Sequence, residues 1–149
     1  MHFRVVGTRH SFNDVADTDG CHISFEYFDQ LILDEEVPLV IIGAGITYTA
    51  LIEFLVENKL AIENLPSLPH VNVVGSLVTG SHGGGVDLKP LANMATGLRM
   101  MNPMGEMVVS QKGEDPDFNT HMHAWGVTGA ITNVALNIEP EFAVRKCIY

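Results

Sequence analysis

The sequence predicts a single domain of mixed helix and strand, α+β or α/β. Short apolar and β-branched runs alternate with loops rich in glycine, proline and polar residues, and one segment shows clear helical spacing. The length of 149 residues suits one domain with a buried core. No internal repeat, linker or low-complexity tract divides the chain.

Composition excludes several classes of protein. The chain is 46% hydrophobic and 17% charged, which is too apolar for a disordered chain, and it has no run of about 18 apolar residues that could span a membrane. The net charge of −10 argues against nucleic acid and anionic membrane surfaces as partners. Cys21 and Cys147 are too few for a disulfide scaffold, and no signal-peptide core is present. We therefore expect a reduced, cytoplasmic protein.

Four elements are expected in the first half of the chain. Residues 3–6 and 22–25 are short strands, because β-branched or aromatic residues there are bounded by turn formers. Residues 38–42 are apolar and β-branched, and predict a buried strand. Thr47 can cap a helix over residues 48–59, in which apolar residues recur at helical spacing.

The second half of the chain is expected to be richer in strands. Residues 71–74 form a short strand-like run, and residues 98–110 predict a hairpin that turns at residues 103–105. Residues 115–118 resemble a loop that leads into a short helix. Residues 125–138 contain alternating β-branched positions, which predict a further strand.

A Gly43-Ala44-Gly45 turn stands between an expected strand and an expected helix. A dinucleotide fingerprint requires a third small residue at position 48, so that the helix can pack closely on the strand. Tyr48 occupies that position, although Glu63 could serve as the ribose-binding acid. An ordinary strand-to-helix turn is favoured, and a Rossmann-type nucleotide-binding protein is the alternative.

An acidic turn near the N-terminus has part of the spacing of a calcium loop. Asp17, Asp19, Gly20 and Glu26 would take positions three, five, six and twelve. Position one would be Val15, which offers no oxygen ligand, and no flanking helices are expected. A solvated acidic turn is the favoured interpretation.

His121 and His123 would share one face if they lay on a strand. A metal site needs a third or fourth ligand, and none stands at a recognisable spacing. We therefore assign no metal site, and ordinary surface or core histidines are the favoured interpretation.

Residues 75–85 contain five glycines and few large side chains. Successive glycines and serines allow backbone N–H groups to converge on an anion, and the hydroxyls of Ser76, Thr79 and Ser81 add donors. No lysine follows the glycines, so this is not a Walker A loop. The segment predicts a phosphate cradle without a fixed cation, and a purely structural loop is the alternative.

Residues 7–13 place small residues and hydroxyls directly after the first expected strand. Arg9 can meet a negative charge, and a neutral His10 is a nucleophile. A structural histidine is the alternative for this segment when it is taken alone.

Four segments in order resemble the FAD-binding domain of the vanillyl-alcohol-oxidase-type (PCMH-type) flavoproteins. They are residues 7–13, 65–71, 75–83 and 125–132. Within these flavoproteins, alditol (xylitol) oxidases and aldonolactone (gulonolactone and arabinonolactone) oxidases are most similar. The resemblance implies an α+β fold in which FAD lies between two small α/β subdomains. It also implies hydride transfer from a polyol or sugar lactone to flavin N5, with oxygen or another acceptor reoxidising the flavin.

The resemblance also implies the residues that hold the cofactor. The first loop wraps the pyrophosphate, and His10 is joined covalently to the flavin 8α-methyl carbon. The second loop and the residues after it follow the cofactor, and the backbone of Ile131 meets its adenine end. The implied cofactor-binding residues are Val5, Val6, Gly7, Thr8, Arg9, His10, Ser11, Asn13, Ser76, Thr79, Gly80, Ser81, His82, Gly83, Gly84, Leu88, Leu91 and Ile131. No catalytic residue is assigned.

Two parts of the resembled family have no counterpart among residues 1–149. They are a strand–helix–strand before residue 3, which leaves the first subdomain incomplete, and a substrate domain after residue 142. We therefore expect the FAD-binding portion of an oxidoreductase, without the residues that bind substrate. A non-catalytic or remnant flavin-binding module is the alternative, and a partner chain or oligomer would cover exposed apolar surface.

Overall fold

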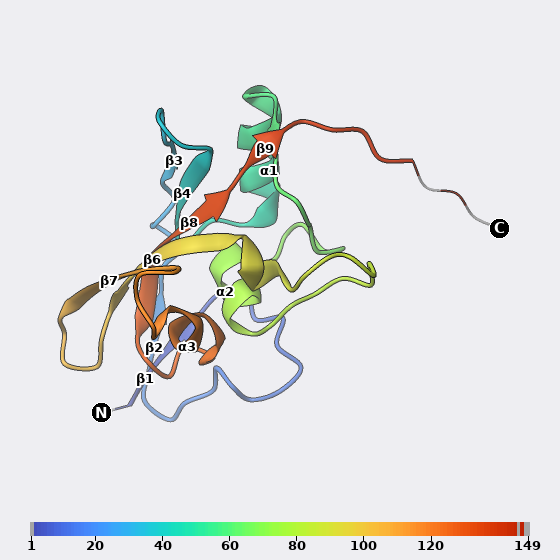
Figure 1. Cartoon of the computed structure of the whole chain (residues 1–149). Coiled ribbons are helices and arrows are strands. Elements are labelled where there is room, and N and C mark those ends of the chain that lie inside the picture. The colour runs from blue at the N-terminus through green and yellow to red at the C-terminus, as the bar shows by residue number, and fades with distance from the viewer. Residues whose placement is uncertain (1, 146, 148–149) are drawn as a thin grey trace.

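A five-stranded antiparallel sheet forms the centre of the computed structural model, which describes residues 2–145 and 147 (Figure 1). Each strand runs opposite to its neighbours. In sheet order the strands are β3 (Leu31–Leu33), β4 (Leu39–Gly43), β8 (Ala130–Asn137), β6 (Ala95–Met101) and β7 (Met107–Gln111). The mixture of helix and strand agrees with the predicted α+β class.

Two smaller sheets and four helical segments complete the fold. The parallel pair is β1 (Phe3–Val6) and β2 (Cys21–Ser24), and the antiparallel pair is β5 (Leu60–Ala61) and β9 (Glu139–Pro140). The helical segments are α1 (Tyr48–Glu57), α2 (Val73–Val78), the 3-10 turn η1 (Leu91–Met94) and α3 (Phe118–His123). Within the described residues, no helix has the length and apolar character needed to cross a membrane.

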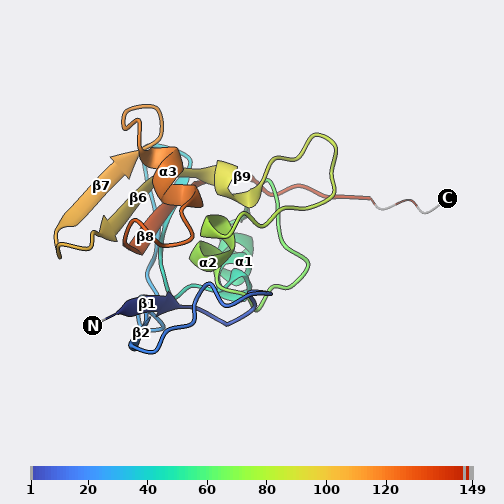
Figure 2. The same cartoon turned by 90° about the horizontal axis from the view of Figure 1, so that it is seen from below.

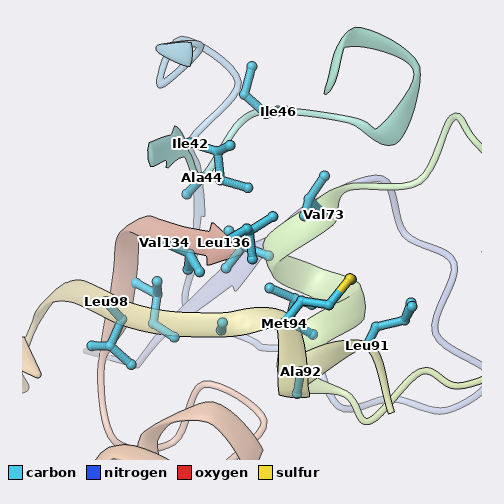
Figure 3. Close-up of a cluster of buried hydrophobic side chains, with 14 of the residues drawn as sticks. Ile42, Ala44, Ile46, Val73, Leu91, Ala92, Met94, Leu98, Val134 and Leu136 are labelled. Atoms are coloured by element: carbon cyan, nitrogen blue, oxygen red, sulfur yellow. The ribbon is translucent and has the colours of Figure 1, made fainter. Parts of the chain in front are cut away.

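The core lies between the sheet and the helices. Alternate side chains of β4 and β8 point inward, as the period of two in a strand requires, and they meet the apolar faces of α1 and α2. Figure 3 shows Ile42, Val134 and Leu136 of the sheet near Val73 of α2. This packing fixes the position of α2.

Helix α1 begins where the sequence predicts and ends two residues earlier than expected. Thr47 caps it by accepting a hydrogen bond from the Ala50 amide at 3.4 Å. Leu51 and Leu55 are buried on its inner face. The helix ends at Glu57 because Lys59 adopts a left-handed conformation with φ of 56°.

The expected strand at residues 71–74 is wrong, because α2 begins there. Asn72 is its N-cap, and its side chain accepts a hydrogen bond from the Gly75 amide at 2.8 Å. Val73 and Leu77 are fully buried on one face of the helix. Tertiary burial therefore overrides the preference of the β-branched residues for strands.

Candidate functional site

The predicted first loop leaves the end of β1 and is exposed from Gly7 to Asp14. Arg9 adopts the left-handed region with φ of 59°, a backbone conformation that residues with a side chain rarely adopt. In the part of the chain that the structure describes, the backbone amides of Arg9, His10 and Ser11 donate to no protein acceptor. This loop therefore presents unsatisfied N–H groups to solvent.

The first loop runs alongside the residues that lead into α2. The Thr8 hydroxyl accepts a hydrogen bond from the Asn72 amide at 3.1 Å, and the rings of His10 and His70 meet with their centroids 4.6 Å apart. A Cβ added at Gly7 would lie 3.2 Å from the Cβ of Asn72, so a side chain here would press on the Asn72 side chain. These contacts place His10 beside the N-terminal end of α2.

Asn72 joins three parts of this region, and sequence reasoning missed it. Its buried side-chain amide donates to the carbonyls of Ala44 at 2.7 Å and Ile46 at 3.2 Å, while its side-chain oxygen caps α2 at Gly75. The available signal was an N-cap pattern, an asparagine three residues before Gly75 at the start of a buried run.

The predicted second loop begins at the C-terminal end of α2. Gly80 has a φ of 73°, which ends the helix in the left-handed conformation that glycine adopts without strain. The Thr79 hydroxyl donates to the Gly75 carbonyl at 2.8 Å, and the Ser81 amide donates to the Ser76 carbonyl at 3.0 Å. Residues 79–81 therefore hold the loop to the helix.

Ser76 lies beneath this loop rather than in it. Its buried hydroxyl donates to the Val73 carbonyl at 2.8 Å, and it receives a hydrogen bond from the Tyr48 hydroxyl at 2.8 Å. The hydroxyls of Ser76 and Thr79, which the sequence offers as donors to an anion, both donate to α2 carbonyls in this structure. Burial raises the pKa of Tyr48 to about 12.

Residues 82–85 are exposed, and their backbone is open. Among the described residues, no protein acceptor receives a hydrogen bond from the amides of His82, Gly83, Gly84 or Gly85. The His82 ring donates to the Gly83 carbonyl at 3.0 Å through Nδ1, and a Cβ added at Gly84 would meet nothing within 4 Å. Four consecutive amides are thus accessible to a ligand.

The turn at residues 43–45 differs from both loops. The Gly43, Ala44 and Gly45 amides donate to protein carbonyls at 2.8–2.9 Å. A Cβ at Gly43 would collide with the Phe28 carbonyl oxygen, because residues 25–28 cross over the turn. Its glycines therefore serve packing, as the missing third small residue indicated, and no amide is left there for a dinucleotide.

A cavity of about 170 Å³ opens beside the first loop. Four predicted site residues line it together with three that sequence reasoning missed. The predicted ones are Val6, Arg9, Ser11 and Asn13, and the others are Ala16, Asp17 and His22. The His22 ring donates to the Ala16 carbonyl at 2.8 Å, so two of the lining residues are joined to each other.

Of the remaining predicted residues, Leu91 is tied to the second loop, because its amide donates to the Ser81 carbonyl at 3.0 Å. Leu91 on η1 and Ile131 on β8 are buried at 1% and 5% exposure, so their side chains belong to the core. Leu88 is 43% exposed, and Val5 on β1 is 36% exposed.

The two metal-like patterns do not form a site. His121 and His123 lie on α3 rather than on a strand, so they do not share a face, because residues two apart on a helix point in nearly opposite directions. In the acidic turn, Gly20 packs against the His2 backbone. The described residues hold no cluster of three or more His, Cys, Asp or Glu side chains suited to a metal.

Comparisons with known proteins identify the family. Residues 1–111 match the family described as FAD binding domain. Alditol oxidase of Streptomyces sp. is 32% identical over 143 residues, which cover 94% of this chain and 34% of that protein. L-gulono-1,4-lactone dehydrogenase of Mycobacterium tuberculosis is 29% identical over 96% of this chain and 33% of its own length. L-gulonolactone oxidase of Mus musculus is 31% identical over 93% of this chain and 32% of its own length.

The chain spans about a third of the length of these relatives. The match confirms the resemblance predicted from the four segments. The chain belongs to the FAD binding domain family, and oxidoreductases of alditols and aldonolactones are among its relatives.

Proposed function

We propose that this chain holds FAD with residues 7–13 and 79–88, as the FAD-binding part of an oxidoreductase that acts on a polyol or sugar lactone. One observation carries the proposal. The amides of residues 9–11 and 82–85 have no protein acceptor among the described residues, whereas those of residues 43–45 are all satisfied. When bound, FAD supplies a hydride acceptor at flavin N5, which oxygen or another acceptor restores.

The two loops fit an anionic dinucleotide in spite of the net charge of −10. Backbone N–H groups carry fixed partial positive charges, and Arg9 adds a guanidinium that can pair with a phosphate. The open backbone at Gly84 allows a diphosphate to approach closely, since a Cβ there would meet no atom within 4 Å. Backbone N–H dipoles and one arginine can thus bind the anionic cofactor without a basic surface.

His10 is the proposed point of covalent attachment. It follows Arg9 on the exposed loop, so its ring is accessible to a ligand held by the neighbouring amides. Farther along the cofactor, we propose contacts from Leu88, Leu91 and the backbone of Ile131. The buried side chain of Ile131 favours a backbone contact at that position.

The wider assembly is also a proposal. The names of the relatives supply the substrate class, a polyol or an aldonolactone. The β1–β2 pair forms its own small sheet, which supports a first subdomain distinct from the five-stranded sheet. We assign residues 1–149 to FAD binding and no residue among them to substrate binding.

A charge placed in the second loop tests the proposal. Gly84→Asp adds a carboxylate beside the open amides, and should weaken FAD binding in a calorimetric titration by roughly tenfold through repulsion of the diphosphate. Gly84→Ala is the matched control, because its Cβ meets no atom within 4 Å, and it should bind FAD like the wild type. Equal affinity of the Asp and Ala variants, or a folded wild type that binds no FAD, would contradict the proposal.

A further inference from the structure

We propose that His70 is a positioning residue for His10. Its ring holds the His10 imidazole in the orientation from which the flavin is attached. This inference rests on the proposed function, since it presumes that FAD is joined to His10.

The two histidine rings form an edge-on contact. Their centroids are 4.6 Å apart and their planes are inclined at 62°. Neither ring makes a side-chain hydrogen bond to another described residue, so the ring contact is the side-chain interaction that can restrain the His10 ring. Edge-to-face pairs at this separation are attractive, because the positive edge of one ring meets the negative face of the other.

His70 sits on a fixed segment, whereas His10 lies on an open loop. The Pro69 carbonyl accepts hydrogen bonds from the Thr49 amide at 2.7 Å and the Thr49 hydroxyl at 3.0 Å. On the other side of His70, the Val71 carbonyl accepts from the Tyr48 amide at 3.1 Å. Both neighbours of His70 are therefore tied to the first turn of α1.

The alignment of the two segments brings the histidines together. Thr8 contacts Asn72, and His10 contacts His70. Residue numbers therefore rise along the first loop while they fall along the segment before α2, which means that the two segments run antiparallel. Arg9, between the two contacts, has the left-handed φ of 59°. The contact between the histidines thus belongs to an antiparallel alignment that Thr8 and Asn72 also hold.

Attachment to His10 has a defined chemical balance. A bond forms between an imidazole nitrogen and the 8α carbon, and one N–H and one C–H bond are lost. The two electrons and two protons pass to dioxygen, giving hydrogen peroxide. His70 exchanges no atom in this process. It limits the rotamers of His10, and so raises the fraction of time that the nitrogen spends in the attacking orientation.

Variants of His70 test its role. After timed incubation of the chain with FAD, the flavin fluorescence that stays with the protein on a denaturing gel gives the rate of attachment. His70→Ala should slow this rate by about twofold to tenfold without changing FAD affinity. His70→Phe keeps a ring and should stay close to wild type. His123→Ala, on the exposed end of α3, is the control and should not change the rate.

A second measurement examines the contact without FAD. In the FAD-free chain, His70→Ala should remove a ring-current shift of the His10 ring protons in NMR spectra. An unchanged attachment rate in His70→Ala would overturn the proposal, and so would a His70→Phe variant as slow as the Ala variant, because a nitrogen of His70 would then be required. If the wild type binds FAD but retains none after denaturation, attachment at His10 itself is refuted and the role of His70 falls with it.

Discussion

Tyr48 stands at the position where a dinucleotide fingerprint needs a small residue, and its role is to join α1 to α2. Its ring is fully buried, and its hydroxyl donates to Ser76, which in turn donates to the Val73 carbonyl. This chain of hydrogen bonds satisfies two buried hydroxyls directly beneath the second loop. The same side chain that argues against a Rossmann site therefore supports the base of the proposed FAD loop.

Replacing Tyr48 by Phe should lower the free energy of unfolding by about 1 kcal/mol at pH 8, since one buried hydrogen bond is lost. Burial raises the pKa of Tyr48 to about 12, so the fold favours the neutral phenol. The stabilisation that Tyr48 gives to the fold is complete below its pKa of about 10 in the unfolded chain. This contribution is lost as the pH rises toward its folded pKa of about 12. The wild type should lose about 1.4 kcal/mol from this group by pH 11.

Urea unfolding of both proteins from pH 8 to 11 measures this effect, because the titration of other groups cancels in the difference. The advantage of the wild type should disappear near pH 11. A difference that stays constant over this range would show that the Tyr48 phenol titrates alike in the folded and unfolded chains.

At the scale of elements, the short helix α2 links the two loops. Thr8 contacts its N-cap residue Asn72, and the open second loop follows its C-terminal end. Asn72 also binds the carbonyls that follow β4, so one buried amide fixes the helix, the turn and the first loop together. A change at Asn72 should therefore affect both stability and FAD binding.

Asn72→Ala should destabilise the fold by about 2 kcal/mol, because it removes the helix cap and leaves buried backbone groups unpaired. Asn72→Ser keeps a side-chain oxygen that can cap Gly75 but loses the amide donor to Ala44 and Ile46, and should lie between wild type and Ala. Thermal unfolding compares the three proteins. A Ser variant as unstable as Ala would mean that the cap contributes little.

Most elements could be predicted from the sequence, and the exceptions have physical causes. The hairpin at residues 98–110 and the strand within 125–138 follow from turn residues and alternation, and both are present as β6–β7 and β8. Residues 71–74 do not form the predicted strand, because the propensity of valine for strands hides a helix that burial selects. The two glycine-containing loops can be recognised in the sequence. The partners of Ser76 and His10 cannot, because they lie 28 and 60 residues away and no local pattern predicts such pairs.

At the scale of the whole molecule, the β1–β2 pair is a small separate sheet with exposed apolar side chains. Figure 2 shows it at one edge, apart from the five-stranded sheet. Parallel strands are normally covered on both faces, yet Phe3 is 58% exposed and Val5 is 36% exposed. A two-stranded sheet alone has little stability. The loop that carries His10 is therefore attached to a strand pair that needs further support.

Hydrogen exchange should report this difference. Amides of β1 and β2 should exchange much faster than those of β4, β6 and β8, because local opening exposes few buried contacts. Adding FAD should slow exchange in residues 7–13 and 82–85, and leave the turn at residues 102–106 unchanged. Protection spread evenly over the chain, or confined to residues 43–45, would contradict the placement of the cofactor.

Covalent FAD at His10 is the most direct test of the central claim. The wild-type chain, incubated with FAD and oxygen and then denatured on a gel, should show flavin fluorescence that migrates with the protein, and peptide mass spectrometry should place it on His10. His10→Ala should abolish the fluorescent band, while His123→Ala should retain it. A folded wild-type chain that shows no bound flavin, or a His10→Ala variant that keeps the band, would contradict the account.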